Sequence, residues 1–261
     1  MRARDAVVAA FATFSRIRVP AGLVEDVDWR GGVALAGFPL VGVIEGIALC
    51  AWAFAAGWLD MPAPIRAAVF ACIPVLVNGG IHLDGLCDVA DAVCSHADRD
   101  RKLQILKDPR TGAFGSMALA CYLLLFYSLA SSAGPLQLAR VSVALPAALA
   151  FSRSLSGLAV LRWPKARPDG MARALAGERG DGSRAAVRAL TVQAVLSGAA
   201  LALLAPAASG PFAICAAAAV YAWYHRFSLR EFGGVTGDTA GWFLQWCELA
   251  MLAVLIFGGM R

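Results

Sequence analysis

Long apolar runs alternate with short polar segments along most of the chain. Gly, Pro or charged residues separate the runs, and a helix needs about 20 mainly apolar residues to cross a bilayer. The pattern therefore predicts an all-α fold, a polytopic transmembrane helical bundle of about seven spans. The runs fall at about 33–58, 64–82, 113–133, 137–161, 188–206, 209–225 and 238–259.

The composition narrows the class of protein further. Of the 261 residues, 59% are hydrophobic and only 16% are charged, and the mean hydropathy is +0.66. A soluble domain has no interior large enough for so much apolar side chain. A soluble enzyme, a disordered chain and a fibrous repeat are therefore excluded. No composition shift marks a second domain, and we expect residues 1–261 to form a single integral membrane domain.

The basic residues are distributed unevenly between the two sides of the predicted bundle. With the N-terminus in the cytoplasm, 19 of the 23 Lys and Arg residues fall on cytoplasmic segments, three fall on the far side and Arg153 lies within a span. This asymmetry follows the positive-inside rule and predicts a cytoplasmic N-terminus. The net charge of +5 then needs no nucleic acid as partner, because basic inner loops face anionic membrane lipids.

Two segments outside the apolar runs have compositions that predict specific structures. Residues 1–18 have a short apolar core between basic residues and no signal-peptidase site, so we expect an interfacial anchor helix. Residues 162–187 hold several glycines among arginines, and we expect them to form a mobile cytoplasmic loop.

The segment 79–91, GGIHLDGLCDVAD, carries three closely spaced carboxylates. On a helix, Asp84, Asp88 and Asp91 share a stripe about 60° wide. Unpaired, they would repel one another, whereas Mg²⁺ prefers oxygen ligands and is usually shared between carboxylates and substrate phosphates. We therefore predict a Mg²⁺ site here, with a solvated acidic helix face as the alternative. His82 points about 160° away from Asp84, and we expect it to make a polar contact and not to bind the metal.

A second motif, KDPRTGAFG at 107–115, precedes the third apolar run. Lys107, Asp108 and Arg110 lie at a predicted helix N-terminus, where free backbone N–H groups favour a bound phosphate. A basic turn that only anchors the helix is the alternative interpretation.

A third motif, FGGVTGDT at 232–239, opens the last run. Gly234 and Thr236 would let the backbone approach a ligand closely. Asp238 would reach the same cytoplasmic pocket as the three aspartates, as a metal ligand or a base.

Three charged residues lie inside the predicted spans, namely Glu45, Arg153 and Glu248. Charges at this depth are costly unless they are paired or face a wet cavity. Two interpretations stay open: a buried ion pair between Arg153 and Glu248, or a place for these side chains in the wall of the active site.

Taken together, these motifs resemble the cobalamin synthase family, adenosylcobinamide-GDP ribazoletransferase. GGIHLDGLCDVAD, KDPRTGAFG, GGVTGDT and a later CEL occur in the family's order and cover nearly the whole chain. The HLDGLxDxxD core is highly specific.

The resemblance implies an enzyme that completes the nucleotide loop of coenzyme B12. A hydroxyl of α-ribazole, or of its 5′-phosphate, would attack adenosylcobinamide-GDP, releasing GMP and giving adenosylcobalamin or its 5′-phosphate. It also implies Mg²⁺ as cofactor and a multi-pass place in the bacterial inner membrane, with the active site facing the cytoplasm. Whether the protein forms a homo-oligomer is left open.

For phosphoryl transfer of this kind, we expect the following roles for individual residues. The metal ligands would be Asp84, Asp88, Asp91 and Asp238, with Asp91 and Asp238 also taking part in catalysis. The substrate-binding residues would be His82, Lys107, Asp108, Arg110, Arg153, Gly234, Thr236 and Glu248.

Two other functions compete with this interpretation. A CDP-alcohol phosphotransferase also has an Asp-rich helix, but its motif needs Ala-Arg where this chain has Val89-Ala90-Asp91. A secondary transporter could use Glu45, Arg153 and Glu248 as a relay, but such proteins often show repeated halves with charge near the midplane. Here most carboxylates lie at one predicted face, and the sequence has no evident repeat.

Overall fold

The computed structural model describes residues 2–177, 180–206 and 208–258, and its regular elements in these ranges are all helices. The longer helices are α1 (Ala3–Phe14), α3 (Val33–Trp58), α4 (Ala63–Asn78), α5 (Ile81–Cys94), α7 (Ala113–Ser132), α9 (Leu145–Arg162), α11 (Asp181–Leu204), α12 (Ser209–Phe232) and α13 (Gly237–Gly258). Short helices connect them: α2 (Ala21–Glu25), α6 (Arg99–Ile105), α8 (Pro135–Ser142) and α10 (Met171–Ala176). The predicted all-α bundle is confirmed.

Four helices in the described ranges are long and apolar enough to cross a membrane: α3, α7, α11 and α13. The pairs α4–α5 and α8–α9 bend by 96° and 47°, and each would add one crossing if it counts as a single broken span. The remaining predicted run, 209–225, lies in α12. This helix has 24 residues, enough to cross a membrane, but it is not among the helices that are also apolar enough. The structure therefore supports a multi-pass membrane protein with four to six spans on these criteria.

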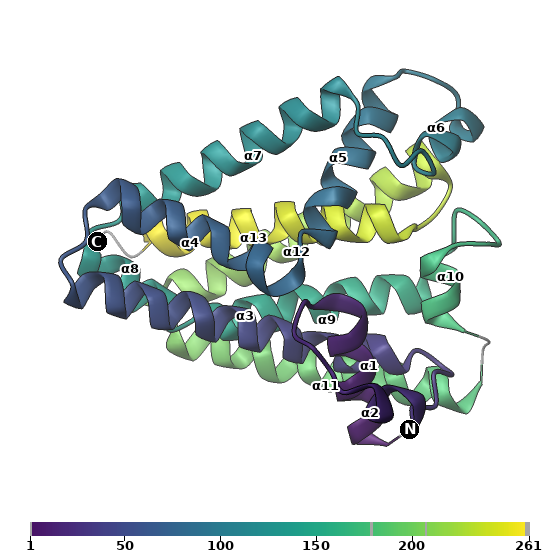
Figure 1. Cartoon of the computed structure of the whole chain (residues 1–261), viewed down its shortest axis with the longest axis horizontal. Helices are drawn as coiled ribbons and strands as arrows, with labels where there is room; N and C mark the ends of the chain where they lie inside the picture. The colour runs from purple at the N-terminus through teal and green to yellow at the C-terminus, as the bar shows by residue number, and fades with distance from the viewer. Residues whose placement is uncertain (1, 178–179, 207, 259–261) are drawn as a thin grey trace.

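The predicted run 64–82 is broken because two consecutive glycines adopt a backbone conformation that other residues rarely tolerate. Gly79 and Gly80 have φ values of 74° and 82°, in the left-handed region. Gly79 ends α4 by donating its N–H to the carbonyl of Val75 at 2.9 Å, and Gly80 donates to the side chain of Asn78 at 2.8 Å. The chain then turns and α5 leaves the direction of α4, which carries the acidic motif to the edge of the bundle (Figure 1).

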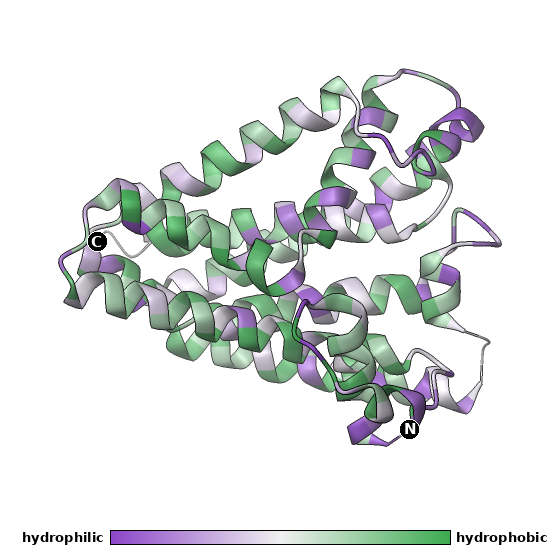
Figure 2. Cartoon of the chain, viewed as in Figure 1, coloured by the Kyte–Doolittle hydropathy of each residue, from purple (hydrophilic) through white to green (hydrophobic). Residues whose placement is uncertain are grey.

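The long helices run back and forth so that the segments 95–112, 163–177 and 233–236 meet at one end of the bundle, which we call the motif end (Figure 1). Hydrophilic residues gather mainly at this end, while the middle of the bundle is apolar (Figure 2). Large apolar side chains also point outward along the helices, as Leu203 does with 84% of its surface exposed. An apolar outer surface suits contact with lipid.

The N-terminal segment is packed into the bundle more closely than an anchor on the membrane surface would be. Helix α1 lies against α3, where Gly37 leaves room for the backbone of Ala6, and it buries Ala9, Ala10 and Phe14. This packing brings an aromatic side chain of the first 18 residues to the motif end.

The segment expected as a mobile loop, 162–187, is partly helical. It contains α10 and the first turns of α11, while residues 178–179 lie outside the described ranges. Its first part is held to the start of α13: Val235 donates to the carbonyl of Pro164 at 2.8 Å, and Ala166 donates to the carbonyl of Val235 at 3.1 Å. These bonds place α10 directly beside the third motif.

Candidate functional site

The first and third motifs meet because two glycines let α5 and α13 approach each other closely. A Cβ atom at Gly85 would lie 2.6 Å from the carbonyl oxygen of Asp238, and one at Gly241 would lie 3.2 Å from the Cα atom of His82. A side chain at Gly85 would clash with the backbone of α13, and one at Gly241 would make an unusually tight contact with α5. The crossing brings Asp84 and Asp238 to the same cavity, as the sequence predicted.

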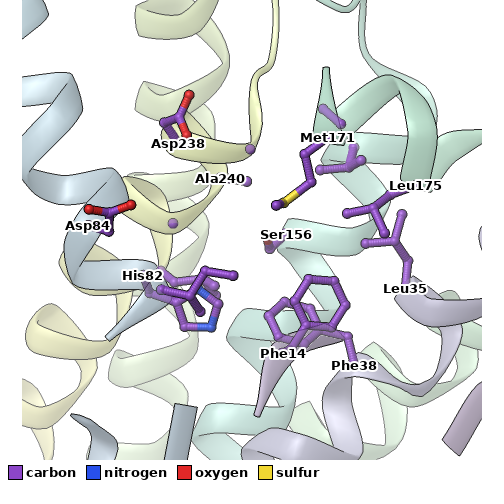
Figure 3. Close-up of a pocket in the computed structure, with 16 residues that line it drawn as sticks. Phe14, Leu35, Phe38, His82, Asp84, Ser156, Met171, Leu175, Asp238 and Ala240 are labelled. Atoms are coloured by element: carbon purple, nitrogen blue, oxygen red, sulfur yellow. The ribbon is translucent and has the colours of Figure 1, made fainter. Parts of the chain in front are cut away.

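At the motif end this cavity offers about 100 Å³ to water-sized molecules, within about 610 Å³ of space that includes its opening to solvent. Two carboxylates, Asp84 and Asp238, stand on one side of it (Figure 3). His82 and Ser156 lie lower in the cavity (Figure 3). The opposite side is apolar, and its residues are Phe14, Leu35, Phe38, Met171 and Leu175.

Asp88 lies one helical turn beyond Asp84 and is half-buried. The charges of Asp84, Asp91 and Asp238 all act on it, so the carboxylates at this end of α5 repel one another. In the parts of the chain that the structure describes, no three His, Cys, Asp or Glu side chains form a preassembled metal cluster. Mg²⁺ is usually bound by one or two carboxylates together with substrate phosphates. The donor set of Asp84, Asp88 and Asp238 is therefore chemically suited to a Mg²⁺ ion that shares itself with a diphosphate.

Asp91, the third aspartate of the stripe, caps a helix. Its Oδ2 accepts the N–H of Gly112 at 2.7 Å and its Oδ1 accepts the N–H of Gly115 at 2.9 Å, both at the start of α7. A carboxylate at this position satisfies free N–H groups and interacts favourably with the helix dipole. The sequence predicted that free N–H groups at the start of α7 would bind a phosphate. In the structure the carboxylate of Asp91 binds these N–H groups instead.

The charged residues of the second motif are exposed at the motif end and paired with carboxylates. Lys107 Nζ lies 3.2 Å from Asp169 Oδ2, and Arg110 binds Asp108 through two contacts of 2.9 Å. The hydrogen bonds from Arg110 lower the pKa of Asp108 to about 2. Exposed ion pairs of this kind contribute little to stability, so both cations can exchange their partners for an anionic ligand. Neither lines the cavity itself.

Gly234 and Thr236 shape the turn that precedes α13 and do not face the cavity. Gly234 lies against the backbone of residues 164–166, where a Cβ would be 2.5 Å from the carbonyl oxygen of Pro164. Thr236 and Thr239 cap the helix reciprocally, with side-chain contacts to each other's N–H groups of 2.9 and 3.0 Å. Their contribution is to fix the position of Asp238 in the first turn of α13.

One charged residue near the cavity was missed in the sequence. Arg167 Nη2 lies 3.5 Å from Asp238 Oδ2, and both side chains are largely buried. In the sequence Arg167 is one basic residue among several in a Gly- and Arg-rich segment, and nothing there distinguishes it. The apolar residues of the cavity were missed for a similar reason, because they lie among many others of the same kind.

Arg153 and Glu248 form the buried pair that the sequence left open, and Glu45 joins them. Arg153 Nη1 lies 2.6 Å from Glu248 Oε1, and Arg153 Nη2 lies 2.9 Å from Glu45 Oε2. Asn78 donates to the same Glu45 oxygen at 3.2 Å. A Cβ at Gly42 would lie 2.6 Å from Arg153 Cδ, so this glycine makes room for the guanidinium arm. The network joins α3, α4, α9 and α13 below the cavity and does not line it.

Fold and site define a multi-pass helical membrane protein with a carboxylate-bearing cavity at one end. The family model described as cobalamin-5-phosphate synthase matches residues 6–256, and the chain belongs to this family.

Curated relatives span nearly the same length as this chain. The adenosylcobinamide-GDP ribazoletransferase of Azorhizobium caulinodans is 38% identical, covering 96% of this chain and 95% of the relative. The protein of that name from Lachnoclostridium phytofermentans is 32% identical, covering 96% and 93%, and one from Pseudomonas aeruginosa strain PAO1 is 38% identical, covering 86% of each. No solved structure matches the chain.

Proposed function

We propose that the protein is an adenosylcobinamide-GDP ribazoletransferase. In this reaction a hydroxyl of α-ribazole, or of its 5′-phosphate, forms a bond to the phosphorus that carries cobinamide. The bond from that phosphorus to GMP breaks, and adenosylcobalamin or its 5′-phosphate results. The observation that carries the proposal is the meeting of Asp84 and Asp238 in one cavity, in a chain whose relatives bear this name.

The side chains of the site would have different roles in phosphoryl transfer. Binding and aligning the two reactants and neutralising charge on the diphosphate are the main tasks of such a site. Asp84, Asp88 and Asp238 would hold Mg²⁺, which when bound supplies positive charge to the diphosphate oxygens. Asp238 also stands where it can accept the proton of the attacking hydroxyl, and Arg167 holds its carboxylate in place.

Basic residues at the motif end supply further positive charge. Lys107 and Arg110 are exposed at the motif end and would bind diphosphate or nucleotide oxygens once these displace their carboxylate partners. We further propose that this end faces the cytoplasm of a bacterium and that the protein lies in the inner membrane. Both reactants would then approach from the side where most of the basic residues gather.

The buried network argues for an enzyme and against a transporter. A transport relay needs charged groups that face a wet pathway, whereas Glu45, Arg153 and Glu248 are paired with one another and lie outside the cavity.

The test is an assay of the purified protein in detergent with adenosylcobinamide-GDP, α-ribazole and Mg²⁺. We expect GMP and the cobalamin product to form in equal amounts, and neither to form when Mg²⁺ is removed with a chelator. A protein that stays properly folded, yet yields no product at any Mg²⁺ concentration, would refute the proposal. Running α-ribazole and its 5′-phosphate in parallel shows which acceptor is preferred.

A further inference from the structure

The cavity has an aromatic side whose function the phosphoryl-transfer chemistry does not explain. The rings of Phe14 and Phe38 lie 4.2 Å apart between centroids, and the imidazole of His82 lies 5.5 Å from Phe38. Leu35 and Leu175 continue this apolar side of the cavity (Figure 3). Aromatic and aliphatic side chains arranged in this way favour a flat apolar ligand, since stacking adds to the burial of apolar surface.

His82 adds a single polar feature to this side. Only 4% of its surface is exposed, and its Nε2 atom has no hydrogen-bond partner in the described part of the chain. A buried polar atom without a partner is costly, so such an atom in a cavity wall indicates a ligand that supplies one. The complementary ligand is mostly apolar, with one acceptor or donor at its edge.

We propose that this cavity binds the base of α-ribazole, with the ribose directed at Asp84 and Asp238. The inference rests on the proposed function and identifies the reactant that occupies the cavity. The base is a benzimidazole with two methyl groups and one unsubstituted ring nitrogen. Its methyl groups would contact Leu35 and Leu175, and the ring nitrogen would accept a hydrogen bond from Nε2 of His82. The ribose hydroxyl then faces the carboxylates that activate it.

The other parts of the two reactants suit this cavity less well. Guanine carries donors and acceptors around its edges, and an apolar wall would leave most of them without partners. A corrin ring with its amide side chains is too large and too polar for a cavity of about 100 Å³ lined by phenylalanine and leucine. The cobinamide and guanosine parts are therefore held outside the cavity, near the basic residues of the motif end.

Leu175→Trp tests the assignment by filling part of the cavity from α10. We expect the KM for α-ribazole to rise about tenfold or more, as overpacking of a fitted site does, while the KM for adenosylcobinamide-GDP stays within about twofold. Leu203→Trp is the matched control, because Leu203 is 84% exposed on α11, away from the cavity. Equal changes in both KM values, or a change for adenosylcobinamide-GDP alone, would overturn the inference.

A second experiment measures binding without turnover and varies the base. Equilibrium dialysis with the wild-type protein should show that the α-riboside of unsubstituted benzimidazole binds about tenfold more weakly than α-ribazole, because two buried methyl groups are lost. His82→Phe keeps the ring and removes the nitrogen, and should weaken α-ribazole binding about three- to tenfold. Equal affinities for the two ribosides would overturn the inference. If α-ribazole binds in this way but no transfer occurs, only the proposed function fails.

Discussion

At the scale of single residues, the aspartates of one motif have different neighbours and therefore different tasks. Asp84 and Asp91 lie on the same face of α5, but seven residues separate them, about 10 Å along a helix. Asp84 reaches the cavity beside α13, whereas Asp91 reaches the N-terminus of α7. The stripe is a real feature of the helix, and the elements packed against it decide what each carboxylate does.

Asp84→Asn tests the task of the first aspartate. The change removes a charge from the cavity wall and keeps the size of the side chain, so we expect transfer activity to fall below detection. Membrane insertion and the melting temperature in detergent should stay unchanged, because Asp84 makes no ion pair within the described residues. Near-normal activity of this variant would contradict a metal-binding role for Asp84.

Asp91→Ala tests the capping role of the third aspartate. Loss of an N-cap costs about 1 kcal/mol, with a range of roughly 0.5–2 kcal/mol, so we expect a lower melting temperature than in the wild type. Asp84→Asn is the matched control, since it alters the same helix without touching a cap. An unchanged melting temperature for Asp91→Ala would show that its two hydrogen bonds to α7 do not stabilise the fold.

The sequence allowed the polar residues of the site to be predicted better than the apolar ones. Asp84 and Asp238 stand out because carboxylates near a membrane boundary are costly and rare. Phe14 and Leu175 do not stand out, because a chain with 59% hydrophobic residues offers many equivalents. Their role depends on the docking of α1 and α10, which is a property of the folded chain.

At the scale of elements, glycines control how closely the helices of the site approach each other. Gly85 follows Asp84 directly and lies against the backbone of Asp238. The sequence motif therefore contains both the proposed metal ligand Asp84 and the small residue that lets α5 approach Asp238 on α13.

Gly85→Ala should separate α5 from α13. The added Cβ would lie 2.6 Å from the Asp238 carbonyl oxygen, a clash that only a shift of the backbone relieves. Displacement of a catalytic group by about 1 Å can cost a factor of about 100 in rate, and we expect kcat to fall at least about tenfold. Gly22→Ala is the control, because a Cβ at Gly22 meets nothing within 4 Å. Equal kcat values for the two variants would contradict the close-approach role.

The break between α4 and α5 shows where hydrophobic patterning fails. The apolar run continues through Gly79 and Gly80, so the pattern alone predicts one helix, and only the positive φ angles of the two glycines end it. Asn78 stabilises the break by accepting the N–H of Gly80 and donating to Glu45. A polar side chain just before two glycines is the local signal for such a turn.

At the scale of the whole molecule, a buried ion network joins four helices beneath the cavity. Arg153 is fully buried between Glu45 and Glu248, and Phe38 lies 5.6 Å from its guanidinium carbon. Because Phe38 also lines the cavity, the network supports the floor of the site as well as the bundle.

Arg153→Met should strongly destabilise the protein. Removing one partner of a buried ion pair costs about 3–5 kcal/mol, because the remaining charges stay buried without compensation. We expect low yield and early unfolding in detergent. The triple variant with Glu45→Gln and Glu248→Gln should recover most of the loss, since no net charge then stays buried. A triple variant no more stable than Arg153→Met would contradict this explanation.

The helical class of the chain follows from its hydropathy, whereas the number of spans does not. Helix α12 is 24 residues long, but its motif-end half contains Tyr221, Tyr224 and His225, which pack around Trp163. Polar aromatic residues lower the mean hydropathy of the helix although it runs the length of the bundle beside α13 (Figure 1). Composition alone therefore does not reveal how α12 lies in the membrane.

Fusion reporters can decide whether α12 crosses. Helices α12 and α13 are antiparallel neighbours joined at the motif end, and α13 ends at the opposite end of the bundle (Figure 1). If α12 crosses along with the other six passes, the number of crossings is odd and the two chain ends lie on opposite sides. With the N-terminus in the cytoplasm, alkaline phosphatase fused to the C-terminus should be active in a bacterial host, and green fluorescent protein there should be dark. The same fluorescent protein at the N-terminus should be bright. A bright C-terminal fusion would mean an even number of crossings, and the cavity would then need another orientation.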